Sequence, residues 1–190
     1  MKKSTIAEKI RVNLLILLNF KLFLSLLFIL MAGVLSSQTV NQLNLQISGM
    51  LSSADPAVVA EGQHLQSLVS DLYPTLMFQN GVLIQYGGDN SVKAECGVAS
   101  LTDLYQPDEA FATVEIILIK IQSVQDLQTI VNLDGLTGFT QLKYLFFLCD
   151  FELCSQSGQS QTCEQEIFAA MIQGSGIEGL KVLYKVSIPS

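Results

Sequence analysis

Residues 114–121 read Val-Glu-Ile-Ile-Leu-Ile-Lys-Ile, and residues 144–149 read Tyr-Leu-Phe-Phe-Leu-Cys. Both stretches have the length of a strand and place apolar side chains at consecutive positions, so both faces of each strand would be apolar. Strands of this kind lie inside a sheet that is covered on both sides, the usual setting of parallel strands in α/β domains. The two stretches therefore predict the centre of such a sheet.

Helical patterns separate these strands from each other and from a last one. Ser123 as N-cap with Asp126 three residues later predicts a helix start between the two strands. Residues 164–173 have helical apolar spacing, and residues 182–188 form a closing strand pattern. The predicted order from residue 114 onward is strand, helix, strand, helix, strand.

The preceding part of the chain predicts a helix and a small sheet. Asp55 as N-cap and Pro56 at the first helical position start a helix that ends at Tyr73-Pro74, whereas residues 40–51 fit a strand or a helix equally well. Asn80-Gly81, between two strand-like segments, is typical of a tight hairpin turn, and a second turn over residues 87–90 precedes a third strand ending at Cys96. We therefore expect an α/β or α+β fold in which a small antiparallel meander is followed by the alternating strands and helices.

The strands of the second half can be aligned as a weak repeat. The repeat aligns three segments that are separated by steps of 28 and 38 residues, namely residues 114–120, 142–148 and 180–186. Apolar residues recur through the middle unit as Leu133-x2-Leu136-x2-Phe139-x2-Leu142-x2-Leu145-x-Phe147, and Asp150 follows. The spacing is irregular and contains no ladder of asparagines.

This spacing resembles a leucine-rich repeat, with Asp150 at the position where that family has Asn. The resemblance covers residues 114–190 and implies a degenerate leucine-rich-repeat-like unit, while a compact βαβ domain explains the same pattern. Neither interpretation transfers functional residues, because repeat proteins of this kind bind their ligands through variable surface positions.

The first 37 residues have a different pattern. Four cations in residues 1–13 precede an apolar run over residues 14–35 and a small-residue exit at residues 33–37. This order is typical of a secretory signal peptide, so we expect cleavage after Ser37 and one exported globular domain over residues 38–190 in the bacterial periplasm, the cell envelope or the medium. The alternative is an uncleaved signal anchor in the inner membrane, because 22 residues from 14 to 35 are long enough to span a bilayer.

All four cysteines lie in the region that we expect to be exported, where an even number predicts disulfides. Cys154 and Cys163 flank an entirely polar segment, so we pair them, which leaves Cys96 to pair with Cys149. A zinc site made of all four thiolates is the alternative, but the spacing contains no Cys-x-x-Cys. We expect no metal and no cofactor.

Charge excludes several kinds of partner. Residues 38–190 contain sixteen acidic residues against five lysines and no arginine, a formal charge of −11. Nucleic acid and anionic lipid surfaces would be repelled, and no guanidinium is present to bind anions in a bidentate manner. We therefore expect a protein or glycan ligand and contact with the membrane only through an uncleaved leader.

Catalytic patterns are sparse. His64 is the single histidine and lies on the polar face of the predicted helix, where we interpret it as an ordinary solvated residue. The chain has no Gly-x-Ser-x-Gly elbow, and paired acids for a carboxylate-dependent hydrolase are limited to Asp108 with Glu109 and Asp150 with Glu152. We assign no catalytic residue. The sequence favours a non-catalytic, disulfide-stabilised binding or structural module over two alternatives, a membrane-anchored envelope accessory subunit and a hydrolase.

Overall fold

The computed structural model of the protein describes residues 39–79, 81–154, 160–174 and 176–187. The chain divides into two units, Met1–Ser37 and Gln38–Ser190, and every described residue belongs to the second. The predicted leader therefore lies outside the described residues. Within the described ranges, no helix combines the length and the apolarity that crossing a bilayer requires.

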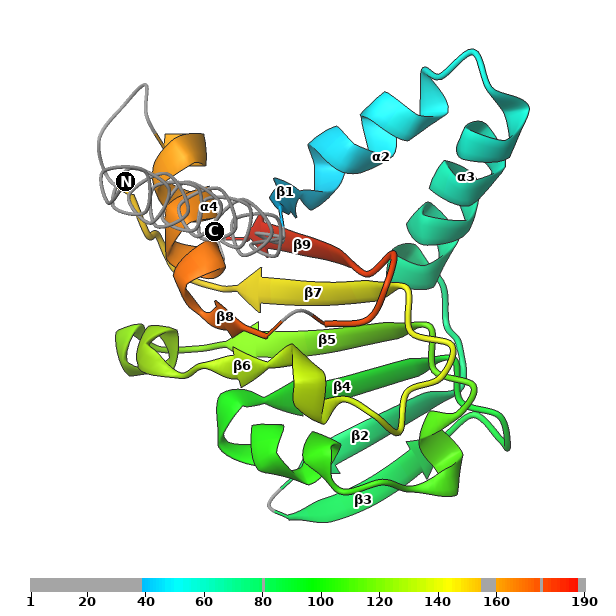
Figure 1. Ribbon diagram of the computed structural model, residues 1–190, viewed down its shortest axis with the longest axis vertical. Coiled ribbons are helices and arrows are strands. Elements are labelled where there is room, and N and C mark those ends of the chain that lie inside the picture. Colours follow the sequence, from blue (N-terminus) through cyan, green and yellow to red (C-terminus); the bar gives the residue numbers. More distant parts are fainter. Residues whose placement is uncertain (1–38, 80, 155–159, 175, 188–190) are drawn as a thin grey trace, which may run out of the picture. The chain divides into compact units, whose positions relative to one another are not determined.

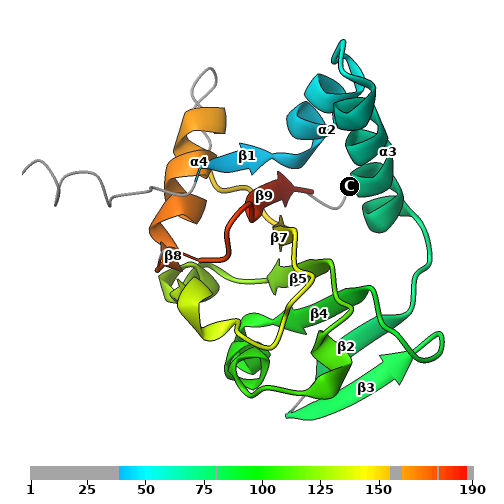
Figure 2. The ribbon, with the colours of Figure 1, turned by 45° about the vertical axis from the view of Figure 1, so that its right-hand side comes forward.

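A seven-stranded sheet forms the centre of the described region (Figures 1 and 2). Its spatial order is β1–β9–β7–β5–β4–β2–β3, and all neighbours are parallel except β2 and β3. The strands are β1 (Val40–Gln42), β2 (Thr75–Gln79), β3 (Val82–Tyr86), β4 (Lys93–Gly97), β5 (Ile116–Ile121), β7 (Tyr144–Cys149) and β9 (Lys181–Val186). The predicted α/β class, with a largely parallel sheet at its centre, is confirmed.

Helices and a second, two-stranded sheet surround this sheet. The α-helices are α2 (Leu43–Leu51), α3 (Pro56–Ser70) and α4 (Ser160–Ala170). Short 3-10 helices occur at η1 (Val98–Tyr105), η2 (Glu109–Phe111), η3 (Val124–Gln128) and η4 (Leu133–Gly135), and the small parallel sheet joins β6 (Val131–Asn132) to β8 (Ile172–Gln173).

The chain from β5 to β9 winds as a coil. It alternates between the two sheets in the order β5, β6, β7, β8, β9, and each strand lies parallel to the strand of the same sheet in the previous turn. The predicted helix after Ser123 is only the 3-10 helix η3, although Ser123 and Asp126 do form the expected capping box. The predicted helix at residues 164–173 begins earlier, at Ser160, and ends at Ala170.

Two apolar cores lie on opposite faces of the large sheet. The larger core includes Phe111, Phe139, Phe147 and Phe168, and joins the sheet to the 3-10 helices, β6 and α4. The smaller core joins α2 and α3 to strand residues of β5, β7 and β9, with none from β2, β3 or β4. Both faces of β7 and of the first half of β5 are buried, so the side chains there are apolar at consecutive positions, as the sequence indicates. Towards its end β5 is more open, at the partly exposed Lys120.

The predicted antiparallel meander is wrong in its third strand. The hairpin exists, since β2 and β3 are antiparallel with Gln79 opposite Val82. Strand β4, however, lies on the other side of β2 and is parallel to it. Residues 87–92 cross the end of β2, with positive φ at Gly87 and Gly88, and this crossing carries β4 into the parallel centre of the sheet.

The N-terminal helices follow the local sequence. Asp55 caps α3 by accepting a hydrogen bond from the Ala57 N–H at 2.9 Å, and Pro56 occupies the first turn, as predicted. The ambiguous segment 40–51 divides into the short strand β1 and the helix α2.

The register of the sheet agrees with one step of the predicted repeat and corrects the other. Ile116 pairs with Tyr144, which is the predicted step of 28 residues. Tyr144 pairs with Lys181, so the second step is one residue shorter than the predicted 38. Both faces of β9 carry buried apolar residues, so its hydrophobic pattern alone does not fix the register.

Candidate functional site

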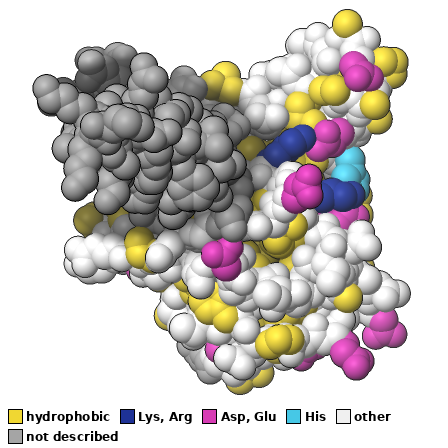
Figure 3. Space-filling view, in the orientation of Figure 1, with side chains coloured by type: hydrophobic (Ala, Val, Ile, Leu, Met, Phe, Trp, Pro, Cys, Tyr) yellow, Lys and Arg dark blue, Asp and Glu magenta, His cyan; other side chains and the backbone are white. Residues whose placement is uncertain are grey.

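The largest group of charged side chains lies between helix α3 and the N-terminal ends of the parallel strands. We call it the α3 cluster, and its members are Glu61, His64, Glu115, Lys143, Tyr144 and Lys181. Glu61 and His64 are three residues apart and therefore lie on one face of the helix. In Figure 3, the single cyan side chain is His64, and it lies among magenta and dark blue side chains.

Glu115 is the acceptor for two cationic or polar groups. Its Oε2 lies 2.8 Å from Nε2 of His64 and 2.8 Å from Nζ of Lys143. Burial alone would raise the pKa of the Glu115 carboxyl, but the hydrogen bonds from Lys143 and His64 outweigh burial and lower the pKa below its ordinary value. Glu115 is therefore ionised at neutral pH and holds both partners.

Glu61 likewise accepts hydrogen bonds from two side chains, which lie at the starts of β7 and β9. Its Oε1 accepts hydrogen bonds from Nζ of Lys181 and, at 3.0 Å, from the hydroxyl of Tyr144. The bond from Lys181 is the main reason that the pKa of Glu61 is lowered. Burial, together with the adjacent carboxylate of Glu61, raises the pKa of the Tyr144 phenol, so Tyr144 stays a hydrogen-bond donor.

The arrangement binds α3 to the sheet. Each carboxylate is matched by a lysine, and Tyr144 is fully buried. Four surface hollows of the described region have volumes of about 190 to 280 Å³, and none is lined by Glu61, His64 or Glu115. The interpretation of His64 as an ordinary solvated residue is wrong, because its ring is bonded to Glu115, 51 residues away in the sequence.

The second candidate site is the half of the sheet that α2 and α3 leave uncovered. We call it the open face, and it presents alternate residues of β2, β4 and β5, namely Met77, Gln79, Glu95, Gly97 and Lys120. A hollow of about 210 Å³ lies at the C-terminal ends of these strands, and these residues and Gln122 are part of its lining. Ligands of parallel sheets commonly bind at the carboxyl ends of the strands.

An ion pair marks the centre of the open face. Nζ of Lys120 lies 2.9 Å from Oε2 of Glu95, and the two side chains are 41% and 18% exposed. Side chains from adjacent strands pair in this way because Glu95 and Lys120 lie on the same side of the sheet, two residues apart in register. Amide groups of Gln79 and Gln122 flank the pair, so the hollow combines charge, hydrogen-bonding groups and the apolar Met77.

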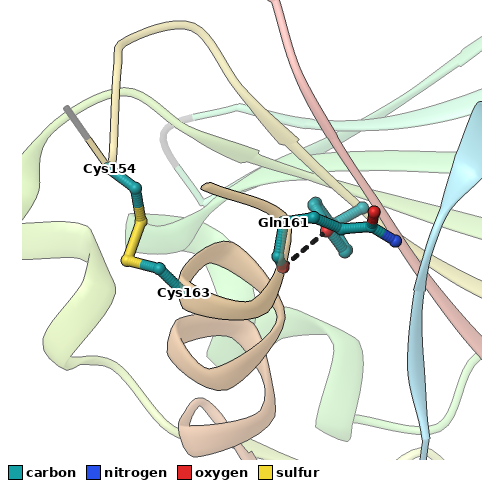
Figure 4. The surroundings of a disulfide bond; sticks show 4 residues. Cys154, Gln161 and Cys163 are labelled. Atoms are coloured by element: carbon teal, nitrogen blue, oxygen red, sulfur yellow. Dashed lines mark hydrogen bonds between the residues drawn. A yellow bond between two sulfur atoms is a disulfide. The ribbon is translucent and has the colours of Figure 1, made fainter. Parts of the chain in front are cut away.

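A disulfide joins Cys154 to Cys163, the pair that the sequence predicts (Figure 4). It connects the segment after β7 to the first turns of α4, with the two Cα atoms 6.3 Å apart. Close to it, the hydroxyl of Tyr184 donates to the carbonyl oxygen of Gln161 at 3.2 Å, a bond drawn in Figure 4. Both contacts fix the start of α4 against the sheet.

The predicted link between Cys96 and Cys149 is wrong. Both thiols are free and buried, on β4 and β7 respectively. Strand β5 lies between these two strands, and neighbouring strands are about 4.8 Å apart, so the cysteines are further apart than the roughly 7 Å that a disulfide can bridge. Burial raises the pKa of the Cys96 thiol to about 12, so this thiol is unreactive.

The paired acids do not form a site. The carboxylate of Asp108 accepts the N–H of Ala110 at 2.9 Å and thereby caps η2, while Asp150 and Glu152 are exposed after β7. Among the described residues, no group of three or more His, Cys, Asp or Glu side chains is placed to hold a metal ion. Sequence reasoning missed the α3 cluster and the ion pair between Glu95 and Lys120. The one feature of the sequence that could have indicated the α3 cluster was the alignment of Glu115 with Lys143 in the repeat.

Comparison of the chain with models of known families, with curated proteins and with solved structures found no match in any of the three.

Proposed function

We propose that the protein is an exported, non-catalytic binding module whose open face contacts a protein ligand. The observation that carries this proposal is the partly exposed ion pair of Glu95 and Lys120 in a hollow on the half of the parallel sheet that α2 and α3 leave uncovered. A hollow of about 210 Å³ is smaller than the roughly 300 Å³ at which small-molecule sites begin, which favours a side chain of a larger partner as its occupant.

The coil from β5 to β9 supports the same proposal. We propose that it is a degenerate leucine-rich-repeat-like unit, because successive turns place parallel strands side by side. Such a unit offers rows of variable side chains on a rigid surface, which suits recognition more than catalysis. Glycan binding is the second choice, since aromatic rings are the usual platforms for sugars and the chain has no Trp.

A position-specific photo-crosslink tests the open face. We expect a photoreactive side chain at Met77 or Gln79 to form a discrete adduct in the native host, and mass analysis of the adduct distinguishes peptide from carbohydrate. The same group at Val124, which is 63% exposed on η3, is the matched control and should give no such adduct. Lys120→Glu should reduce the adduct at Met77 at least tenfold.

Two results would reject the open face as the binding surface. One is an equal yield of adducts at Met77 and Val124. The other is an adduct at Met77 that Lys120→Glu leaves unchanged, because the reversed charge places like charges beside Glu95 and disrupts the centre of the site.

Export is tested separately by the intact mass of the protein isolated from the host. A mass that begins at Gln38 supports the cleaved leader. A full-length mass found in the membrane fraction supports the alternative of an accessory subunit anchored by residues 14–35, and a full-length mass in the cytosol rejects export.

A further inference from the structure

Strand β3 leaves one edge of the large sheet open. Its residues Val82–Tyr86 read Val-Leu-Ile-Gln-Tyr, with neither charge nor proline, and no other described element lies on its outer side (Figures 1 and 2). Val82 and Tyr86 are 56% and 51% exposed. Soluble proteins usually protect such an edge with charges, proline, a bulge or a very short strand. The opposite edge is protected, because β1 has three residues and runs directly into α2.

The hydrogen-bonding direction along β3 follows from β2. The carbonyl oxygen of Pro74 accepts hydrogen bonds from Val92 and Lys93, on the β4 side. The next residue, Thr75, therefore directs its backbone toward β3, where it pairs with Tyr86. Alternation along β3 then turns the N–H and C=O groups of Leu83 and Gln85 outward, away from β2.

We propose that this edge pairs with the same edge of a second copy of the chain. The two β3 strands would run antiparallel about a two-fold axis at Ile84, with Leu83 opposite Gln85 of the second copy. Those two pairs would exchange four backbone hydrogen bonds. On one face of the joined sheet, Ile84 would meet its counterpart and Val82 would meet Tyr86 of the second copy.

The strand is complementary to itself in this orientation. Val82, Ile84 and Tyr86 are all apolar and lie on the same face, so each meets an apolar partner across the axis. A two-fold interface requires such self-complementarity. Charge favours the antiparallel arrangement. Asp89 follows the C-terminal end of β3, so antiparallel pairing places the two copies of Asp89 at opposite ends of the paired strands. Parallel pairing would place the two negative charges side by side.

Single cysteines in the full chain test this register. Ile84→Cys places two Cα atoms about 4.5 Å apart across the axis, within disulfide range. Leu83→Cys or Gln85→Cys alone places them about 9 Å apart, outside it. Under mild oxidation we expect at least ten times more covalent dimer from I84C than from either control. The buried thiols of Cys96 and Cys149 are 2% and 0% exposed and should not interfere.

A mixture of the two control variants provides an independent check. L83C with Q85C should form a covalent heterodimer, although neither forms a homodimer alone, because these positions face each other. Ile84→Lys should lower the dimer fraction at least tenfold in sedimentation, whereas Leu72→Lys, at a fully exposed position away from the edge, should leave the fraction unchanged.

The proposal is overturned if I84C stays monomeric and the L83C–Q85C mixture gives no heterodimer. It is also overturned if L83C alone cross-links as fully as I84C, since the dimer would then reflect random collision. Neither result bears on the open face, which lies on other strands.

Discussion

At the scale of single residues, the carboxylate of Glu115 is the most informative group because it serves two partners. Glu115→Gln keeps the shape but removes the charge that attracts His64 and Lys143. Hydrogen bonds to charged groups are worth about 1.5–3 kcal/mol, and the partial exposure of both partners reduces this, so we expect a loss of about 1 kcal/mol in the free energy of unfolding at pH 7. Urea denaturation followed by circular dichroism measures the difference.

The pH dependence of this difference has a definite sign. The pKa of Glu115 is lower in the folded protein than its ordinary value of 4.5, so the stabilisation is fully present above that value. It is lost as the pH falls through the lower, folded-state pKa. The wild type and Glu115→Gln should therefore approach equal stability once the pH lies below the folded-state pKa of Glu115. A difference that stays undiminished down to acid unfolding would contradict the assignment.

The disulfide supports a second prediction at this scale. Cys154→Ser opens a loop with a sequence separation of 9, and the loop-entropy relation gives a loss of roughly 2.5–3 kcal/mol. Native-state alkylation of this variant should label Cys163 alone. Labelling of Cys96 or Cys149 before global unfolding would contradict their burial.

Residue patterns predicted the local features and missed the long-range ones. The cap at Asp55, the turn at Gly81 and the loop-closing disulfide depend on neighbours within about ten residues, and each is present. The predicted disulfide between Cys96 and Cys149 was wrong because the distance between these residues depends on strand order, and β5 lies between their strands. His64 was misassigned for the same reason, since its partner comes from the edge of a distant strand.

At the scale of elements, the packing of α2 against α3 depends on a close approach at Gly62. A Cβ added there would lie 2.8 Å from Cβ of Met50. We expect Gly62→Ala to lower the free energy of unfolding by about 1–2 kcal/mol, because overpacking costs about 1–3 kcal/mol and the helix propensity of Ala returns up to about 1 kcal/mol. Thermal and urea unfolding would both show the loss.

Gly49 on α2 is the matched control. A Cβ at this position meets nothing within 4 Å, so Gly49→Ala should stabilise the protein by about 0.5–1 kcal/mol through helix propensity alone. If both substitutions stabilise the protein to the same extent, α2 and α3 do not pack as closely in solution as the structure shows.

Strand order was harder to predict than strand position. The patterns located β2, β3, β5 and β7 to within two residues of their observed ends. The place of β4 beside β2 could not be predicted, because a turn of Gly and Asn residues is compatible with a meander and with a crossing over the end of β2. The two-residue strands β6 and β8 carry no periodicity that a sequence pattern could reveal.

At the scale of the whole molecule, the open face was beyond prediction because it is defined by what the helices leave uncovered. Glu95 and Lys120 are far apart in the sequence, and no local pattern links them. Their pairing follows from the parallel register of β4 and β5. The charge excess, by contrast, is visible in the sequence and governs the behaviour of the entire region from residue 38 onward.

This excess predicts that salt stabilises the fold. Residues 38–190 contain sixteen acidic residues and only five lysines, so the acidic residues repel one another at low ionic strength. At 0.01 M the Debye length is about 30 Å, and this repulsion acts over long distances. At 0.15 M the length falls to about 8 Å, and the repulsion between distant acids is largely screened. Added salt also weakens the four ion pairs of the described region, but each is partly exposed and loses at most about 1 kcal/mol of stabilisation. We therefore expect the urea midpoint to rise between 0.01 and 0.15 M NaCl.

A charge-reduced variant separates screening from other effects of salt. Asp89→Asn with Glu152→Gln removes two exposed negative charges, so its urea midpoint at 0.01 M NaCl should exceed that of the wild type and should rise less with added salt. Screening by simple electrolytes is complete well below 1 M, so sodium chloride and potassium chloride should act alike. A midpoint that falls with salt would mean that the α3 cluster and the pair of Glu95 with Lys120 outweigh the repulsion, and the ion pairs would then be the dominant electrostatic contribution to stability.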